Sequence, residues 1–145
     1  MEIRKFLLEE VAQFESSRKG KKYPAGTIVM PIHGVGDDHF SIRQLKQAEE
    51  VSSRYVCITS KDLPADYLYV AIEAELDRFL SRYLQTINIS FKDVGRMELY
   101  IHTDPQDQRA IVACFQGLNQ MIETTERQIS EKNRMKINLL DRMMA

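Results

Sequence analysis

The 145-residue sequence contains no long hydrophobic run and only two cysteines. No stretch approaches the roughly 20 consecutive apolar residues that a membrane-spanning helix needs. The N-terminal segment carries Glu9, Glu10 and Glu15 where a secretory signal requires an unbroken apolar stretch, so we expect a cytoplasmic location. Cys57 and Cys114 form no Cys-x-x-Cys pair and have apolar neighbours, which predicts two buried, reduced thiols.

Motifs for catalysis are missing as well. The Gly34-Val35-Gly36 stretch lacks the third glycine of a dinucleotide-binding loop, and no Walker lysine follows it. Ser52 and Ser53 have no surrounding G-x-S-x-G motif, so a serine nucleophile is not expected. The His33–His39 loop holds two histidines and two aspartates, which suit a transition metal, but their spacing matches no closed zinc set. We therefore predict no enzyme, no cofactor and no metal, with a small enzyme that uses this loop as the weakest alternative.

An excess of charge of one sign is also missing, because 20 basic and 21 acidic side chains give a net charge of −1. Such a balance argues neither for nor against nucleic acid as a partner. The distribution is uneven, since residues 1–30 have two more basic than acidic side chains. Residues 31–105 have four more acidic than basic side chains, and residues 106–145 have one more basic than acidic. The N-terminal segment is therefore the candidate for contact with a polyanion.

The densest basic cluster lies between Ser16 and Pro24. Four cations surround Gly20 there, and they are Arg18, Lys19, Lys21 and Lys22. Serine hydroxyls, a flexible glycine and basic side chains together suit contacts with a phosphate backbone. The sequence leaves two interpretations open, which are a mobile, solvated loop between two elements and a loop that contacts DNA phosphates.

Residues 1–104 carry the signals of a small α+β domain, for which we expect a small mixed sheet with packed helices. Alternating and β-branched apolar patterns predict strands over 27–32, 53–59, 86–89 and 96–102. Apolar residues at helical spacing predict helices over 40–50 and 66–80, and over 2–15 either a helix or a strand that leads into a helix. Tyr67 and Tyr69 follow this spacing, so we assign them to the core rather than to a base-stacking platform.

Residues 105–145 are predicted to form one long helix. Asp104-Pro105 is a helix-start signal, and a single glycine interrupts the segment that follows. A helix of about 38 residues is about 57 Å long, which is more than a body of about 105 residues needs. Its heptad-like apolar seam, weakened by polar Thr125, Lys132 and Lys136, consists of Leu118, Ile122, Ile129, Met135, Leu139 and Met143. The seam predicts a coiled coil with a second helix, and the alternative is a helix that bends back onto the body.

Stretches along most of the chain carry a resemblance to one family. A turn and a glycine precede an apolar strand in Tyr23–Val29, and a tyrosine-rich helix follows in Pro64–Ile72. Ile89–Val94 followed by Met97–Ile101 forms the stretch that leads into the last strand. The long helix then begins with Pro105–Val112 and continues through Asn119–Met144. In this order they resemble the specificity subunit of type I restriction–modification systems, which joins a target-recognition domain to a long spacer helix.

This resemblance implies a shortened target-recognition-like domain over residues 1–104 and a spacer or dimerisation helix over residues 105–145. It implies a protein that binds double-stranded DNA and docks on a modification methyltransferase, with catalysis on other subunits. A full family subunit generally has two recognition domains and two spacer helices, whereas this chain has one of each, so we expect a homodimer that presents two half-sites. The alternative is a non-catalytic relative that pairs with or blocks restriction–modification subunits without reading DNA, which the acidic middle segment favours.

Overall fold

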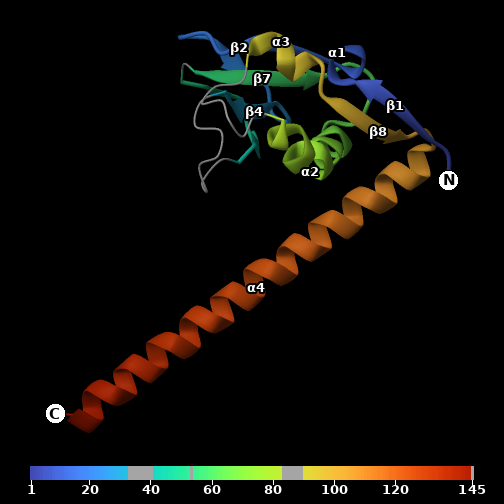
Figure 1. Ribbon diagram of the computed structural model, residues 1–145. Helices are drawn as coiled ribbons and strands as arrows, with labels where there is room; N and C mark the ends of the chain where they lie inside the picture. Colours follow the sequence, from blue (N-terminus) through green and yellow to red (C-terminus); the bar gives the residue numbers. More distant parts are fainter. Residues whose placement is uncertain (33–40, 53, 83–89, 145) are drawn as a thin grey trace. The chain divides into compact units, whose positions relative to one another are not determined.

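The computed structural model describes residues 1–32, 41–52, 54–82 and 90–144. The chain forms two compact units, Met1–Arg109 and Ala110–Ala145. The first unit contains the described strands and three helices, and the second consists of most of one long helix (Figure 1). The His33–His39 loop and the strand expected over 86–89 lie outside the described residues.

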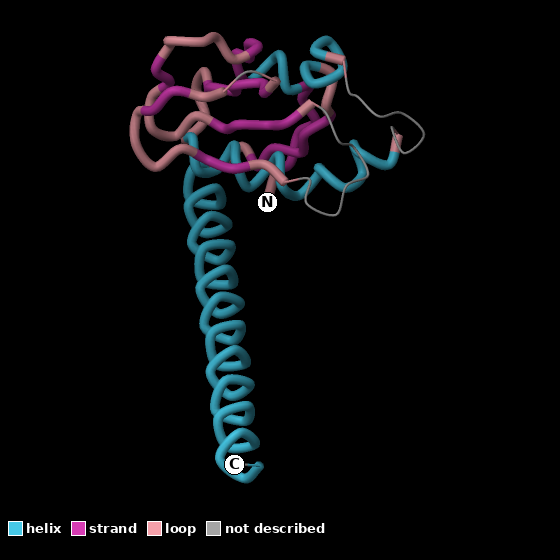
Figure 2. Tube along the Cα trace, turned by 90° about the vertical axis from the view of Figure 1, so that its left-hand side faces the viewer, coloured by secondary structure: helices cyan, strands magenta, loops and turns pink. Residues whose placement is uncertain are grey.

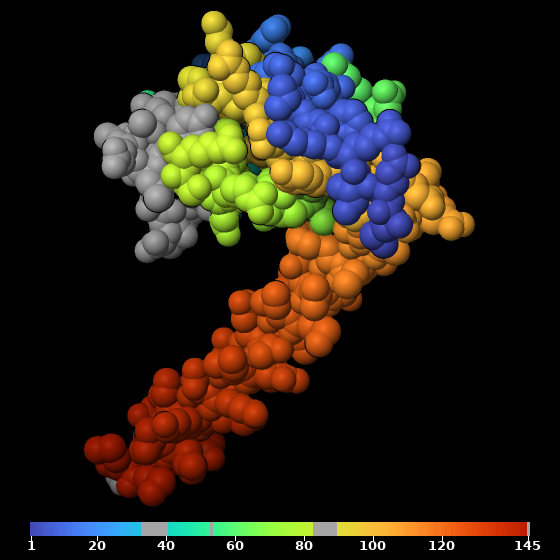
Figure 3. Space-filling view, turned by 45° about the vertical axis from the view of Figure 1, so that its right-hand side comes forward, coloured from blue at the N-terminus to red at the C-terminus, as the bar shows by residue number. Residues whose placement is uncertain are grey.

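The strands described in the first unit pair antiparallel throughout and form three small sheets. The largest has the order β2 (Ala12–Ser16), β7 (Tyr55–Ser60), β4 (Ile28–Pro31) and β5 (Arg43–Gln44). The other two pair β1 (Ile3–Leu7) with β8 (Glu98–His102) and β3 (Lys22–Tyr23) with β6 (Glu49–Glu50). Figure 3 shows β1, in blue, lying along the amber β8 at the surface. The α+β class is confirmed, and three antiparallel sheets stand where we expected one mixed sheet.

The helix expected over residues 2–15 is wrong for most of its length. β1 and β2 occupy this segment, and only the single turn α1 (Leu8–Val11) is helical. The alternative prediction, a strand that leads into a helix, is correct for residues 3–11. β1 pairs with β8 and β2 pairs with β7, both of which are distant in sequence. Leu8 at the turn is fully buried. The apolar residues therefore fall at helical spacing because one turn of helix joins two strands of different sheets.

The helix expected over residues 40–50 is also wrong. The described part of this segment holds the short strands β5 and β6. Leu45 lies between them, where its carbonyl accepts the Gly26 N–H at 2.8 Å and its N–H donates to the Thr27 carbonyl at 2.9 Å. These long-range backbone bonds and the burial of Leu45 outweigh the local helical pattern, which is a weak influence by comparison.

The other elements of the first unit agree with the sequence. β4, β7, β8 and the helix α2 (Ala65–Ser81) are confirmed, and a helical turn, α3 (Phe91–Gly95), forms before β8. α2 contacts β8 through Tyr67, which is 2% exposed and therefore part of the core, as expected. The Tyr67 hydroxyl accepts the His102 N–H at 2.8 Å and lies 3.0 Å from His102 Nδ1. These bonds fix α2 against the last strand.

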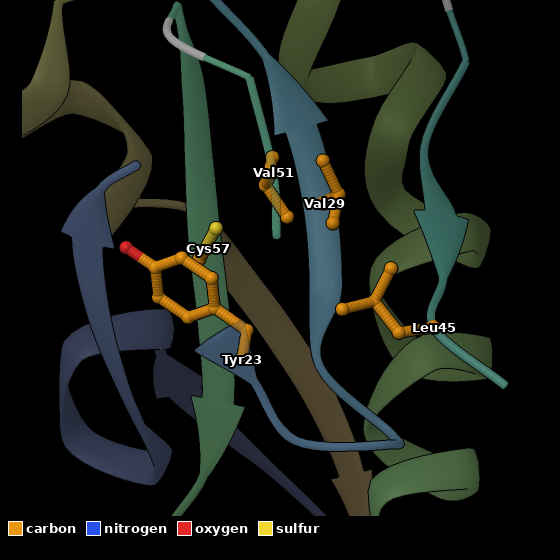
Figure 4. Packing of buried hydrophobic residues seen from close by; sticks show 5 residues of the cluster. All are labelled: Tyr23, Val29, Leu45, Val51 and Cys57. Carbon is orange, nitrogen blue, oxygen red and sulfur yellow. The ribbon is translucent and has the colours of Figure 1, made fainter. Parts of the chain in front are cut away.

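A compact hydrophobic cluster lies on one face of the β2-β7-β4-β5 sheet. Its five members are at most 3% exposed, and they are Tyr23, Val29, Leu45, Val51 and Cys57 (Figure 4). Figure 4 shows the Tyr23 ring beside the Cys57 sulfur. Cys57 is buried, as expected, and this burial raises the pKa of its thiol, which disfavours the reactive thiolate.

The long helix α4 (Pro105–Met144) runs without a break for 40 residues (Figure 2). Its start is held by two polar contacts, because Asp104 Oδ1 accepts the Gln106 N–H at 2.9 Å and the Gln108 amide donates to the His102 carbonyl at 2.7 Å. Cys114 is exposed, so the expectation of a buried thiol is wrong at this position. In the described parts of the chain, no helix has both the length and the hydropathy of a membrane span.

Candidate nucleic-acid interface

The basic cluster forms the connection between β2 and β3 together with the first residue of β3, and we call this segment, residues 17–22, the basic loop. Its start is fixed by Ser17, whose hydroxyl donates to the Ser52 carbonyl at 2.7 Å and accepts the Tyr55 N–H at 3.4 Å. Its turn has Gly20 at a φ of +83°, a conformation that glycine adopts without steric strain. Hydrogen bonds therefore anchor the start of this turn to the neighbouring residues Ser52 and Tyr55.

Tyr23 is the second anchor of the basic loop. Its ring is 2% exposed in the hydrophobic cluster, and its hydroxyl accepts the Arg18 N–H at 3.0 Å. The Lys21 ammonium lies 5.1 Å from the centre of the same ring, within the range of a cation–π interaction. The loop backbone is therefore positioned by a core residue. This role of Tyr23 is not evident from the sequence, in which Tyr23 belongs to a turn signal.

The charges of the basic loop are partly balanced by Glu15 on β2. One Glu15 oxygen lies 3.4 Å from Arg18 Nε, and the other forms an ion pair with Lys21 Nζ. Lys19 and Lys22 form no ion pair with any described residue. The loop thus presents two cations that are already paired and two that form no ion pair, of which Lys22 has Glu50 as its cross-strand partner. The role of Glu15 is not predicted above, although an acid three residues before a basic cluster is a sequence signal for such a pairing.

A hollow of about 260 Å³ lies beside the basic loop on the face of the sheet. Its walls come from β2, β3 and β7, and its lining residues are Gln13, Phe14, Glu15, Tyr23, Cys57 and Thr59. The strand register explains this grouping, because Gln13 is the cross-strand partner of Thr59 and Glu15 is the partner of Cys57. The hollow is therefore built on the rigid sheet rather than on a loop.

The seam residues lie on α4 within a stretch, residues 118–144, in which every residue is exposed. The exposed fraction is 54% for both Leu118 and Ile129, and the other expected members, Ile122, Met135, Leu139 and Met143, are also exposed. Thr125 in the seam donates its hydroxyl to the Met121 carbonyl at 2.8 Å, which satisfies it within the helix. A solvent-exposed apolar stripe of this length is typical of a helix that pairs with another chain.

One further polar pair lies on α2. The Tyr69 hydroxyl donates to Glu73 Oε1 at 3.1 Å, and burial together with the Glu73 carboxylate raises the pKa of Tyr69 to about 12. Burial also raises the pKa of Glu73, while the hydrogen bond from Tyr69 opposes this rise. Tyr69 therefore stays protonated and half-buried, which agrees with a structural role. In the parts that the structure describes, no three His, Cys, Asp or Glu side chains are grouped to hold a metal ion.

No protein-family model and no curated protein matches this sequence, but solved structures do match. The type I restriction–modification S subunit from M. genitalium matches with a TM-score of 0.69 at 14% identity, over 85% of this chain and 40% of that chain. The HsdS subunit from Thermoanaerobacter tengcongensis matches with a TM-score of 0.62 at 15% identity, over 86% of this chain and 39% of that one.

A third match comes from a structure that addresses complex assembly and conformational transition of the type I R-M system. It has a TM-score of 0.71 at 16% identity, over 90% of this chain and 41% of that chain. The resemblance seen in the sequence is therefore confirmed at the level of the fold. The chain spans about two fifths of the length of the chains that it matches.

Proposed function

We propose that this chain is a DNA-binding specificity half-subunit of a type I restriction–modification system, which dimerises through α4 and docks on a modification methyltransferase. The observation that carries the proposal is the fold match, which covers 85–90% of this chain but only about two fifths of two S subunits and a third type I R-M chain. One small α+β domain of about 104 residues, shortened relative to a usual target-recognition domain, and one long helix are what half of such a subunit would contain.

The basic loop is the proposed contact with DNA. Lys19 and Lys22 form no ion pair with the described residues, although Glu50 is the cross-strand partner of Lys22, and Arg18 and Lys21 share Glu15. Cations on an anchored loop can neutralise phosphates without a large loss of backbone entropy on binding. Each neutralised phosphate releases counterions, so the affinity should fall steeply as salt rises. These contacts position the domain on DNA and carry no sequence information by themselves.

The seam of α4 is the proposed dimer contact. One small recognition domain covers few base pairs, which limits its affinity for a specific site. Two copies joined through Leu118, Ile129, Leu139 and the other seam residues would present two half-sites with twofold symmetry. Pairing would also remove the exposed apolar stripe from water, which is favourable at roughly 25 cal/mol for each Å² buried.

Charge favours antiparallel pairing of the two helices. In a parallel pair, Lys132 would face Lys132 of the partner helix, and Lys136 would face Lys136, so like charges would repel within the seam. Residues 110–126 carry two acidic and no basic side chains, whereas residues 127–144 carry five basic and two acidic ones. An antiparallel pair places the acidic part of each helix against the basic part of the other.

Catalysis is assigned to the partner rather than to this chain. The hollow beside the basic loop contains Cys57, but its thiol is buried and its pKa is raised, so it lacks the character of a nucleophile. Two matched structures are S subunits, and a third concerns assembly of the type I R-M system. A methyltransferase subunit of such a system is therefore the partner that we propose to supply the chemistry.

A mass measurement with and without DNA tests the proposal. We expect light scattering to give a dimer, and fluorescence anisotropy with labelled random duplex DNA to show binding that weakens as the NaCl concentration rises. Co-purification with the modification methyltransferase subunit should then yield a complex that retains DNA binding. A monomer that binds no duplex at low salt would contradict the proposal.

The alternative is a non-catalytic interaction protein of the same fold, which pairs with or blocks restriction–modification subunits without reading DNA. The observation that favours it is Glu15, which balances two of the four cations in the basic loop. Binding to the methyltransferase subunit without binding to duplex DNA at low salt would support this alternative.

A further inference from the structure

Two polar side chains in the hollow beside the basic loop lack partners. Gln13 is exposed and Thr59 is half-buried, and as cross-strand partners they lie next to each other on the β2-β7 pair. Neither the Gln13 amide nor the Thr59 hydroxyl forms a hydrogen bond with any other described residue. Other polar groups of the hollow are already engaged, since Glu15 pairs with Arg18 and Lys21 and the Tyr23 hydroxyl accepts the Arg18 N–H.

The hollow suits the edge of a flat polar group better than a complete small molecule. Its volume of about 260 Å³ is below the roughly 300–1,000 Å³ of pockets that enclose drug-sized ligands. Two of its lining residues, Cys57 and Tyr23, are only 1% and 2% exposed, whereas Gln13 is exposed and Thr59 is half-buried. The free hydrogen-bonding groups are therefore at the rim, where a group that approaches from outside would meet them.

We propose that Gln13, supported by Thr59, reads a base edge of duplex DNA in the major groove. This inference rests on the proposed function and names the residue that would add sequence preference to the phosphate contacts of the basic loop. A glutamine amide offers a donor and an acceptor side by side, which matches the N6 and N7 groups of adenine. Thr59 adds a hydroxyl that can donate or accept at the neighbouring position.

The geometry of β2 supports this assignment. β2 is an edge strand of the four-stranded β2-β7-β4-β5 sheet, so no described strand pairs with its outer side. An exposed side chain on such a strand can enter the B-DNA major groove, which is about 12 Å wide. Arg18 is five positions after Gln13, so the distance between their Cα atoms is at most about 17 Å, the length of a fully extended chain of five steps. With a base edge at Gln13, the basic loop would therefore be near the phosphates that border the groove. Glu15 lies between them, and its charge is offset by Arg18 and Lys21.

Selection from randomised duplexes tests the inference with the full chain. The probe is a pool of DNA duplexes with a randomised central segment, and the bound fraction is sequenced. We expect the unaltered protein to enrich a motif that contains a preferred adenine. In Gln13→Ala, the preference at that position should fall roughly 5- to 150-fold, while low-salt binding to random duplex is retained. Gln47→Ala is the matched control, because Gln47 is exposed on the same unit outside the hollow.

A second pair of variants strengthens the test. Gln13→Glu keeps the shape but removes the donor, so the preferred base should change from adenine to cytosine, whose N4 group donates. Thr59→Val should weaken the preference at the adjacent position, whereas Thr103→Val should not. An enriched motif that is unchanged in Gln13→Ala and Gln13→Glu would overturn this inference and leave the proposed function standing. If the unaltered protein binds no duplex, both fail.

Discussion

The Tyr23 hydroxyl accepts the Arg18 N–H at 3.0 Å, and this bond connects the hydrophobic cluster directly to the basic loop. The Tyr23 ring is packed with Cys57, Val29 and Val51, so its hydroxyl has little freedom to move. The position of the loop backbone therefore depends on the core of the first unit. A change in that core can alter the loop without touching any of its cations.

Replacing Tyr23 with phenylalanine removes this bond and leaves the packing of the ring. We expect Tyr23→Phe to lower the free energy of unfolding by about 0.5–1.5 kcal/mol, the usual contribution of one hydrogen bond. DNA affinity should fall several-fold, because the free loop has more conformational freedom without this bond and loses more conformational entropy when it binds DNA. Urea unfolding and anisotropy titrations measure the two effects. Tyr100→Phe is the control, since Tyr100 is exposed and its hydroxyl forms no bond with the described residues. Equal affinities in both variants would contradict the anchoring role.

Removing the charge of Glu15 should strengthen DNA binding. In Glu15→Gln, Arg18 and Lys21 lose their acidic partner and become available to phosphates. The slope of log affinity against log salt should become steeper by about 0.9 for each additional phosphate contact, so by at most about 1.8. Anisotropy titrations over a series of NaCl concentrations measure this slope. Glu9→Gln changes the net charge equally on an exposed residue and should leave the slope unaltered. A weaker, less salt-dependent complex for Glu15→Gln would show that Glu15 serves to hold the loop in its binding conformation.

A charge in the seam of α4 should separate the proposed dimer. Leu139→Asp places a carboxylate where the proposed partner helix packs, and burying an unpaired charge is strongly unfavourable. We expect the mass from light scattering to halve, with the circular dichroism of the first unit retained. Asn138→Asp adds the same charge at the adjacent position, outside the seam, and should remain a dimer. An unchanged dimer in Leu139→Asp would rule out the seam as the contact.

The natural Cys114 reports the direction of helix pairing. It is exposed on α4 and therefore accessible to an oxidant. If two antiparallel helices cross near Ile129, the two copies of Cys114 are 30 residues of helix apart, which is about 45 Å. We expect no disulfide-linked dimer after mild oxidation, and a linked dimer when Ile129→Cys places a thiol near the crossing point. A Cys114 disulfide that forms in the unaltered protein would indicate parallel helices.

The parts of the fold that could be predicted are those whose signal is local. β4 and β7 have β-branched runs, α2 has a regular helical period, and the α4 segment has a helical period with no proline after Pro105, so the sequence predicts both kinds of element correctly. The segments around Leu8 and Leu45 were not, because their backbones bond to strands far away in sequence. A helical spacing of apolar residues cannot reveal such pairing.

The same distinction applies to the candidate site. The four cations are adjacent in sequence, so their cluster was evident. Glu15 and Tyr23 acquire their roles only when β2 and β3 bring them to the loop, and Gln13 meets Thr59 only through the pairing of β2 with β7. The roles of these residues follow from register, which a single sequence does not contain.

The position of Glu15 has a consequence for how long the protein would stay on DNA of any sequence. Its carboxylate already occupies the place that a phosphate would take between Arg18 and Lys21. Binding at these two cations is then an exchange of one anion for another, which yields less free energy than binding to free cations. Complexes on DNA without the target site would therefore dissociate sooner. A protein that must find few sites among many gains search speed from such short residence times.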